Sequence, residues 1–562
     1  MTISSLKVHR GPGHARSHGM KGSVMTDEMS GDDAGYDLVI VGLGPSGAAA
    51  ANAAGAFGLR TLVVERDLAI FERQRAIALD DEALRVIRGL GLYDEVTAHM
   101  HLGVTARFIG LDGKPFLATP AEPTAYTGHS LANFFHQPAL EHALRDGLKR
   151  YACVEVKAGW TAEFVGQDAD EVTLRLSDVD GDRRVVRARY VLACDGGSSS
   201  MRKQLDIPFA GTSYSEQWMD VQALVKRPLH RDPHFDFVCS PDRPGVRCPC
   251  PGGYYRWEWR VNPGEDAETM LAEDNVWRML AAEGVTPDDI DIARTWSYTF
   301  HVRKAKQWRR GRVLLLGDAA HVMPPFAGQG ISGAFRDTAN VVWKLEAVIR
   351  GRAGDRLLDT YQSEREPHHD AMTNRAVTFG RLVMTSNRTV EKLRDNVFRA
   401  TSKIPGVMTA VVRHIAKPTP LGPGCLPTGK QNALVGYLIA PARVALPGIR
   451  MSDIDEALGP GWVILGLDED PRTAMPKATV ADWERFGARF LTIRPGTSVV
   501  EGEEIGDPTG QLWNTMTTNG ARFVVVRPDR YVFAAVADAH SVAAPMYAAC
   551  AAPCAETSGL PD

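Results

Sequence analysis

The stretch from Gly311 to Arg350 constrains the fold more than any other part of the chain. It opens with a short apolar run, Val313 to Leu316, of the kind that forms a buried strand. A loop rich in proline and glycine follows, and a long segment with apolar residues at helical spacing begins near Gly330. The start of such a helix presents unpaired backbone N–H groups and the positive end of the helix dipole. This strand, loop and helix therefore suit a flat, anionic ligand that lies against the backbone.

A second glycine-rich turn lies near the start of the chain, between two predicted strands, Tyr36 to Val41 and Thr61 to Glu65. An alanine-rich helical segment separates the strands, and the turn reads Gly-x-Gly-x-x-Gly. Each glycine has its own task in such a turn. Gly42 permits the tight turn, Gly44 lets the backbone approach a pyrophosphate, and Gly47 lets helix and strand pack closely.

The residues around this turn complete a dinucleotide-binding pattern. Pro45 and Ser46 stand at the predicted helix start, where backbone N–H groups hold phosphate. Glu65 ends the second strand, followed by Arg66, and an acid at this place accepts a hydrogen bond from a ribose hydroxyl. The alternative is a glycine turn in an ordinary strand–helix–strand unit. The pattern predicts dinucleotide binding without choosing between FAD and NAD.

The segment GDAAHVMPPFAGQG, residues 317–330, resembles the second FAD motif of the class A flavoprotein monooxygenases, the aromatic hydroxylases. In that family the aspartate, here Asp318, binds the ribityl and pyrophosphate region of FAD. The resemblance implies that the following helix start faces the pyrimidine edge of the flavin and stabilises negative charge on the reduced ring. It also implies a dry loop beside the reacting ring, with Pro324 in a catalytic position. The residues implied to contact FAD here are Pro325, Gly328, Gln329, Gly330 and Ile331.

Three more segments follow the order of the family's motifs. Arg75 resembles the arginine that contacts the pyrophosphate side of FAD, and Gln137 matches a glutamine that touches FAD from a helix start. Asp195 begins an Asp-Gly motif that lies near the pyrophosphate and is implicated in pyridine-nucleotide binding. The alternatives at these positions are a surface arginine, a polar helix start and a turn.

Residues 206–310 are rich in predicted strands, and in the family such a sheet covers the flavin and forms much of the substrate pocket. Strand alternation in YYRWEW puts Tyr254 and Arg256 on one face and Tyr255 on the other. We expect Tyr254 and Arg256 to be catalytic residues that orient a hydroxylated aromatic acid. The alternative is ordinary sheet packing and surface charge.

The chain changes character near residue 400, where a linker rich in proline and glycine precedes several short predicted strands. This last part resembles the thioredoxin-like C-terminal domain of the phenol hydroxylase subgroup. It contains no Cys-x-x-Cys, so a redox role is not expected. A role in packing, or in forming a homodimer, suits it better.

Together these observations predict an α/β fold in which an antiparallel substrate sheet interrupts a Rossmann-like FAD-binding domain. We expect a disordered tail at residues 1–34 and the two parts of the FAD-binding domain at 35–205 and 311–400. The substrate-binding domain is expected at 206–310, and the thioredoxin-like domain at 401–562.

Composition excludes several other classes of protein. The net charge of −4 gives no basic footprint for nucleic acid, and no apolar run reaches the length needed to cross a membrane. Eight scattered cysteines fit a reducing, cytoplasmic setting. Cys239, Cys248 and Cys250 lie close together in sequence, but no histidine stands at a ligand spacing beside them, so we expect no metal.

The resemblance also implies a reaction. NADH or NADPH reduces FAD, and reduced flavin with O₂ adds one oxygen atom to a phenolic aromatic acid, ortho to its hydroxyl group. Another phenol or a polycyclic polyketide aromatic is the alternative substrate, and the base that deprotonates the phenol is not identified. A halogenase, a reductase and a non-catalytic flavin-binding protein are rival interpretations, although the halogenase pattern GWxWxIP is absent.

Overall fold

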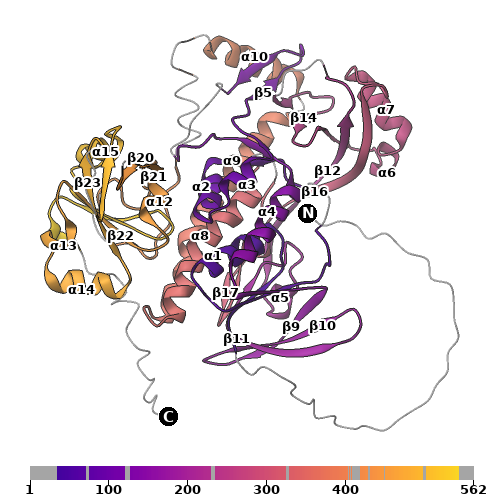
Figure 1. The fold of residues 1–562 in the computed structure, drawn as a ribbon. Helices are drawn as coiled ribbons and strands as arrows, with labels where there is room; N and C mark the ends of the chain where they lie inside the picture. Colours follow the sequence, from indigo (N-terminus) through magenta and orange to yellow (C-terminus); the bar gives the residue numbers. More distant parts are fainter. Residues whose placement is uncertain are drawn as a thin grey trace, which may run out of the picture.

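The computed structural model describes residues 35–542, except for 71–74, 120–126, 230–233, 325–327, 386, 403, 405–406, 408–417, 428–430, 449 and 498–501. The expected tail at 1–34 lies outside the described residues, as does Pro325. Three large sheets and one small sheet, with helices around them, form a mixed α/β fold (Figure 1).

The first elements are β1 (Tyr36–Val41), α1 (Pro45–Ala56) and β2 (Thr61–Glu65), with the strand boundaries that the sequence predicted. The two strands pair in parallel and are almost entirely buried, as their unbroken apolar runs require. The turn between β1 and α1 depends on glycine at two positions. Gly42 has a φ of 100°, and a Cβ on Gly47 would lie 1.9 Å from the Gly42 carbonyl oxygen.

The first sheet has eight strands around a parallel centre in the order β18, β11, β1, β2 and β8. The long strand β11 also pairs with β10, and β9 and β10 form an antiparallel ribbon beside it at the lower side of Figure 1. The remaining bounds are β8 (Val154–Ala158), β9 (Trp160–Gln167), β10 (Val172–Asp178), β11 (Arg183–Ala193), β17 (Arg309–Arg310) and β18 (Val313–Leu315).

Helix α8 (Gln329–Ile349) runs through the middle of the molecule, and nearly all of its residues from Ser332 onward are buried (Figure 1). It packs against α1, α2 and α9, which explains why its buried residues are not confined to one face. No helix within the described ranges is both long and apolar enough to span a bilayer. The neighbouring elements are α2 (Asp81–Gly89), α3 (Tyr93–Thr97), α4 (Gln137–Gly147), η1 (Leu148–Arg150), α5 (Ser200–Gln204), η2 (Gly317–Ala319), η4 (Asp355–Asp359) and α9 (Thr360–Val383), with the small sheet of β3 (Ala78–Leu79), β4 (Met100–His101) and β7 (Asn133–Phe135).

The second sheet also has eight strands, in the order β19, β16, β12, β15, β14, β13, β5 and β6. Strands β5, β6 and β19 come from outside residues 206–310, so this sheet combines several separate segments of the chain. Helices α6 and α7 cover one face, and α10 packs against β6. The bounds are β5 (Ala106–Ile109), β6 (Pro115–Ala118), β12 (Phe209–Val225), β13 (Phe235–Val238), β14 (Gly245–Cys250), β15 (Tyr254–Arg260), α6 (Ala267–Met270), α7 (Glu273–Ala282), β16 (Ile290–Ala305), β19 (His321–Val322) and α10 (Arg388–Ser402).

The third sheet belongs to the C-terminal part of the chain and has seven strands, in the order β21, β20, β24, β23, β22, β25 and β26. Strands β22, β23 and β24 run parallel, whereas β25 and β26 are antiparallel to their neighbours. The bounds are β20 (Arg443–Leu446), β21 (Arg450–Asp453), α12 (Ile454–Leu458), β22 (Val463–Leu467), α13 (Pro471–Ala474), α14 (Lys477–Arg485), β23 (Arg489–Pro495), β24 (Glu504–Asp507), α15 (Gln511–Thr518), β25 (Phe523–Val526), β26 (Val532–Val536) and η5 (Ala539–Ser541).

This C-terminal part is joined to α8 and α9 by buried charges. Its ribbon is coloured orange to yellow in Figure 1. Glu364 of α9 accepts from Arg527 at 2.8 Å and from Lys344 of α8 at 2.7 Å, and none of the three side chains has exposed surface. Trp343 of α8 meets Trp462 edge to face, with ring centroids 5.5 Å apart. The C-terminal part therefore supports the helix whose first turn reaches the candidate site.

Candidate active site

Three loops with predicted FAD-binding residues meet at one edge of the first sheet. Strands β1, β11 and β18 are adjacent and parallel, so their carboxyl ends point the same way. They lead into the glycine turn at Gly42, the loop at Asp195 and the loop at Asp318 respectively. Ligands of open α/β sheets bind just beyond the carboxyl ends of the strands. The strand order therefore unites motifs that are far apart in the sequence.

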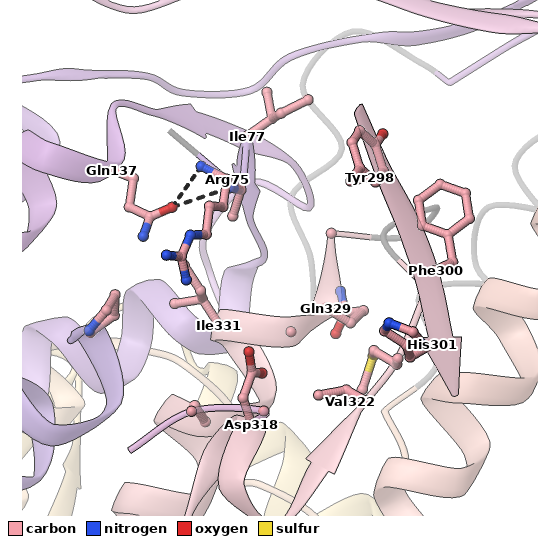
Figure 2. A pocket seen from close by; sticks show the side chains of 18 of the residues that line it. Arg75, Ile77, Gln137, Tyr298, Phe300, His301, Asp318, Val322, Gln329 and Ile331 are labelled. Carbon is pink, nitrogen blue, oxygen red and sulfur yellow. Dashed lines mark hydrogen bonds between the residues drawn. The ribbon is translucent and has the colours of Figure 1, made fainter. Parts of the chain in front are cut away.

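These loops line one end of a cavity of about 620 Å³. In Figure 2, Arg75 and Gln137 lie on one side, Tyr298, Phe300 and His301 lie on the other, and the start of α8 lies between them. The predicted cofactor residues that line the cavity are Gly44, Pro45, Ser46, Arg66, Arg75, Gln137, Asp195, Asp318, Gly328, Gln329, Gly330 and Ile331. The predicted cofactor residues that the structure describes but that do not line the cavity are Gly42, Gly47 and Glu65.

The cavity is open where a dinucleotide would approach the backbone. A Cβ on Gly44 or Gly330 would meet no neighbouring segment of the described chain within 4 Å. Gly44 and Gly328 are the N-caps of α1 and α8, and neither helix start has a side-chain cap. Within the described residues, Oδ1 of Asp195 is buried without a hydrogen-bond partner. Two uncapped helix starts suit the phosphates of FAD, and a carboxylate oxygen without a partner suits a hydroxyl group.

Two predicted cofactor residues use polar atoms to hold the protein itself. Glu65 Oε2 accepts the backbone N–H of Leu43 at 2.6 Å, which fixes the glycine turn. Gln137 Oε1 accepts the backbone N–H groups of Arg75 at 2.9 Å and Ala76 at 3.2 Å (Figure 2). These bonds set the shape of the cavity wall, and direct contacts of Glu65 and Gln137 with FAD stay predictions.

At the other end of the cavity, the second sheet contributes a buried cluster of four polar side chains. Arg256 of β15 forms an ion pair with Asp220 of β12, and its Nε lies 2.7 Å from Glu258 Oε1. The hydroxyl of Tyr298, on β16, donates to Glu258 Oε2 at 2.6 Å. Arg256, Glu258 and Tyr298 line the cavity, and no member of the cluster is more than 6% exposed.

The charges in this cluster are set by burial. Burial raises the pKa of Asp220 well above its usual range, and nearby Glu258 adds to this effect while Arg256 opposes it. The pKa of Arg256 is raised, because Asp220 and Glu258 outweigh the cost of burial. Burial likewise raises the pKa of Tyr298. Burial therefore opposes ionisation of Asp220, while the two neighbouring acids favour the charged form of Arg256.

Of the three residues predicted to be catalytic, the structure brings one to the cavity. The strand alternation is confirmed, since Arg256 faces the cavity while Tyr255 packs with Trp257 on the opposite face. Arg256 is already paired with two acids, and its expected role in holding a substrate acid stays a prediction. Tyr254, at the first position of β15, stacks on His136 with ring centroids 5.9 Å apart and is not among the described lining residues. Pro324 is buried and does not line the cavity either.

Sequence reasoning missed the acids and the tyrosine of the cluster. A signal existed for Glu258, because the alternation that places Arg256 on one face places Glu258 there too. Asp220 and Tyr298 gave no signal, because their positions depend on how β12 pairs with β15 and β16. Strands β12, β13 and β16 of the same sheet add aromatic residues to the cavity wall. They are Trp218, Phe235, Phe237 and Phe300.

The three cysteines considered as metal ligands are buried thiols. Cys239, Cys248 and Cys250 have at most 1% exposure, and burial raises the pKa of Cys239 to about 12. Cys248 has its pKa raised as well, first by burial and then by its contact with Cys250. Within the described ranges, no group of three His, Cys, Asp or Glu side chains is placed to hold a metal ion.

Comparison with known families agrees with this geometry. Residues 35–376 match the family described as FAD binding domain, and residues 436–551 match the HcaD C-terminal domain. The chain belongs to the FAD-dependent aromatic hydroxylases, the flavoprotein monooxygenases, as its motifs predicted. FAD is its cofactor, and NAD(P)H is the reductant typical of the family.

Particular relatives cover almost the whole chain. The 3-(3-hydroxy-phenyl)propionate/3-hydroxycinnamic acid hydroxylase of Escherichia coli (strain K12) is 34% identical over 507 residues, which cover 88% of this chain and 91% of that one. The corresponding hydroxylase 2 of Burkholderia vietnamiensis (strain G4 / LMG 22486) is 36% identical over 520 residues, with coverage of 90% and 94%.

Solved structures share the fold at lower identity. The flavin-dependent monooxygenase PieE, in complex with FAD and substrate, has a TM-score of 0.74 at 22% identity, covering 93% of this chain and 99% of that one. Aklavinone-11 hydroxylase, in complex with FAD and aklavinone, has a TM-score of 0.75 at 21% identity, covering 92% and 99%.

Proposed function

We propose that this hydroxylase uses NADH or NADPH and O₂ to hydroxylate a phenolic aromatic acid such as 3-(3-hydroxyphenyl)propionate, ortho to its hydroxyl group. One observation carries the proposal, namely a single cavity that runs from the glycine loops to an aromatic wall of the second sheet. The names of relatives that are 34% and 36% identical over most of the chain support this substrate class.

Within this proposal, the loops at the edge of the first sheet hold FAD. Gly44, Pro45 and Ser46 face the pyrophosphate at the start of α1, and Asp318 accepts from the ribityl chain. The start of α8, residues 328–331, lies against the flavin. FAD supplies the hydride-accepting and oxygen-activating chemistry that no side chain offers. These roles are supported by the cavity's lining and by the two uncapped helix starts.

The second sheet would receive the phenol. Aromatic side chains, among them Phe235 and Phe237, offer a flat apolar wall for a ring, and Val322 and Met323 continue it toward the cofactor loops. Such a wall also keeps water away from the reacting atoms. The part of the reaction left to polar groups is the removal of the phenol proton.

A second candidate substrate is a phenol, or a polyketide aromatic, that carries no carboxylate. One observation favours it, because Asp220 and Glu258 already neutralise Arg256. Arg256 is the only arginine or lysine that the second sheet contributes to the described cavity lining. A substrate carboxylate would therefore need a partner elsewhere.

We also propose the finer domain assignments. The FAD-binding domain is Rossmann-like and formed by residues 35–205 and 311–400, and residues 401–562 form a thioredoxin-like domain. The strand order β23, β22, β25, β26, with its parallel and antiparallel pairs, supports the second assignment. Contacts with α8 and α9 favour a packing role for this domain. The described cysteines are unbridged, which suits a reducing cytoplasm.

The test is a panel of substrates given to the FAD-loaded protein. Hydroxyphenyl acids, simple phenols and polyketide aromatics are each supplied with NADH or NADPH, and mass spectrometry follows the addition of one oxygen atom. We expect faster NAD(P)H oxidation and an oxygenated product with a hydroxyphenyl acid. Product from only the carboxylate-free compounds would favour the second candidate. Oxygen consumption without any oxygenated product would overturn both.

A further inference from the structure

The buried cluster at the substrate end of the cavity has the composition of a proton-accepting site. Glu258 is the only carboxylate that the second sheet contributes to the described lining, and it contacts both Arg256 and Tyr298. Asp220 pairs with Arg256 and is not among the described lining residues, and the ring of Trp296 lies 5.2 Å from the guanidinium. The cluster therefore opens toward the cavity only through Arg256, Glu258 and Tyr298.

We propose that Tyr298 and Glu258 form a relay that takes the proton from the hydroxyl group of the phenolic substrate. The proposal rests on the proposed function, since a phenol must occupy the cavity. The O–H bond of the substrate breaks, and its proton joins the oxygen of Tyr298. The proton that Tyr298 held passes to Glu258 Oε2, along the existing 2.6 Å hydrogen bond. The products are a phenolate and a protonated Glu258, and no electrons change hands.

The charge of Arg256 acts on both sides of this transfer, because it opposes protonation of Glu258 and stabilises the phenolate that forms. Before it, Glu258 and Asp220 are both paired with the guanidinium of Arg256. After it, one of the two acids paired with Arg256 is neutral, so the guanidinium can stabilise a phenolate nearby. Tyr298 is a conductor of the proton rather than its final acceptor, because burial raises its own pKa. Asp220 and Arg256 act as positioning residues.

The other titratable groups of the cavity fit this task less well. Asp195 and Asp318 belong to the loops of the cofactor end. His301 contacts Ser213 at 2.9 Å, and burial lowers its pKa, so it is a weak base. Arg256 keeps its proton at every accessible pH. Among the described lining residues, Glu258 alone combines a carboxylate, a hydrogen-bonded tyrosine and a neighbouring positive charge.

The first test measures ionisation of bound phenol without turnover. The FAD-loaded protein is titrated with 3-(3-hydroxyphenyl)propionate and with phenol in the absence of NAD(P)H. Changes in flavin absorbance report binding, and the ultraviolet difference spectrum reports phenolate. We expect bound phenol to ionise at a lower pH than free phenol, whose pKa is about 10. If bound phenol ionised at the same pH as free phenol, this result with the wild-type protein would by itself overturn the relay.

The second test uses Tyr298→Phe and Glu258→Gln, which keep the shape of the side chains. We expect both to bind the phenols, to ionise them only at higher pH, and to lower kcat at neutral pH by roughly 10²-fold, the usual scale of general-base catalysis. Raising the pH, or supplying a ring-fluorinated and therefore more acidic phenol, should restore much of the rate. If kcat fell equally at every pH, and equally for the ordinary and the fluorinated phenol, the effect would be structural and the relay would be overturned.

Matched controls lie far from the cavity. The hydroxyl of Tyr190 donates to Asp355 at 2.7 Å, and Glu155 accepts from Tyr36 at 2.7 Å. Tyr190→Phe and Glu155→Gln remove the same chemical groups and should leave ionisation and kcat unchanged. If neither phenol perturbs the wild-type flavin spectrum, the proposed function fails together with the relay. If phenol binds and ionises equally in wild type and both relay variants, the relay alone fails.

Discussion

The two ends of the cavity are built by different means. At the cofactor end, the wall is largely backbone, with glycines that face open space and two helix starts without side-chain caps. At the substrate end, the wall consists of buried side chains, and four of them form one charge-balanced cluster around Arg256. The first end is shaped to receive charge from a ligand, whereas the second already contains its own charges.

This difference has consequences for substitution. A backbone wall tolerates changes to the side chains that face the ligand, because those side chains do little to hold the fold. A buried cluster does not, because removal of one member leaves the others without a partner in a low-dielectric interior. We therefore expect substitutions at the cofactor end to weaken the binding of FAD. Substitutions at the substrate end should lower the free energy of unfolding.

The largest expected effect follows from Arg256→Leu. This change leaves Asp220 and Glu258 as two buried carboxyl groups without a cation. Removing one partner of a buried ion pair typically costs about 3–5 kcal/mol. We expect a loss of that size in the free energy of unfolding, measured by denaturant titration of the FAD-loaded protein.

Two further variants test whether the cost comes from burial. Arg243 pairs with Glu265 at 2.5 Å in a partly exposed setting, so Arg243→Leu should cost about 1 kcal/mol or less. The double change Arg256→Leu and Asp220→Leu should recover part of the stability, because fewer buried acids are left. Equal losses in the free energy of unfolding for Arg256→Leu and Arg243→Leu would show that burial is not the cause of the cost.

At the cofactor end, Asp318→Ala should weaken the binding of FAD and leave the fold unchanged. Asp318 is exposed to the cavity that it lines. A hydrogen bond to a charged group contributes about 1.5–3 kcal/mol, which corresponds to a roughly 10- to 100-fold weaker affinity for FAD. The ratio of flavin to protein absorbance in the purified protein measures the loss. A fully yellow variant would contradict the role proposed for Asp318.

The same contrast explains how much could be predicted from the sequence. The glycine turn at Gly42 and the loop at Asp318 were recognisable because their geometry is set within short stretches of chain. Their meeting at one edge also followed, since parallel neighbouring strands place their carboxyl ends together. Strand boundaries were predictable there for the same reason, because unbroken apolar runs mark buried parallel strands.

The substrate end could be predicted only in part. Alternation along one strand placed Arg256 correctly, but the partners of Arg256 come from β12 and β16, whose register no local pattern specifies. Tyr254 shares the face of Arg256, yet it lies at the strand end and contacts His136 instead of the cavity. Nothing in the sequence distinguished these two positions, because the shape of the cavity depends on all three strands.

Two buried acids, Asp337 and Asp220, have pKa values that are shifted in opposite directions. Burial raises the pKa of Asp337 on α8, but His321 and Arg365 outweigh it, so the pKa falls to about 2. Asp220, facing Arg256 and Glu258, has its pKa raised instead. Stability from Asp337 is therefore present above about pH 4 and lost as the pH falls toward 2, whereas stability from Asp220 is present at low pH and lost as the pH rises.

Replacing each acid by asparagine should show these opposite signs. We expect Asp337→Asn to lose about 2 kcal/mol at pH 7, and this loss should shrink toward zero near pH 2. Asp220→Asn, which resembles the protonated acid, should be least destabilising at high pH and give a flatter stability curve between pH 4 and 8. Denaturant titrations across this pH range measure both. If the free energy of unfolding of the two variants changed with pH in the same way, the two acids would have the same charge state. The opposite pKa shifts would then be wrong.

The smallest effect is expected from Tyr254→Phe. The ring of Tyr254 stacks on His136 with an interplanar angle of 1°, and phenylalanine keeps this contact. Because Tyr254 does not line the described cavity, loss of its hydroxyl should change kcat less than about 2-fold and stability by less than about 0.5 kcal/mol. NAD(P)H oxidation with the preferred phenol measures the rate. A drop in kcat as large as that of Tyr298→Phe would place Tyr254 at the reacting phenol, and the substrate end would then extend along β15 to its first residue.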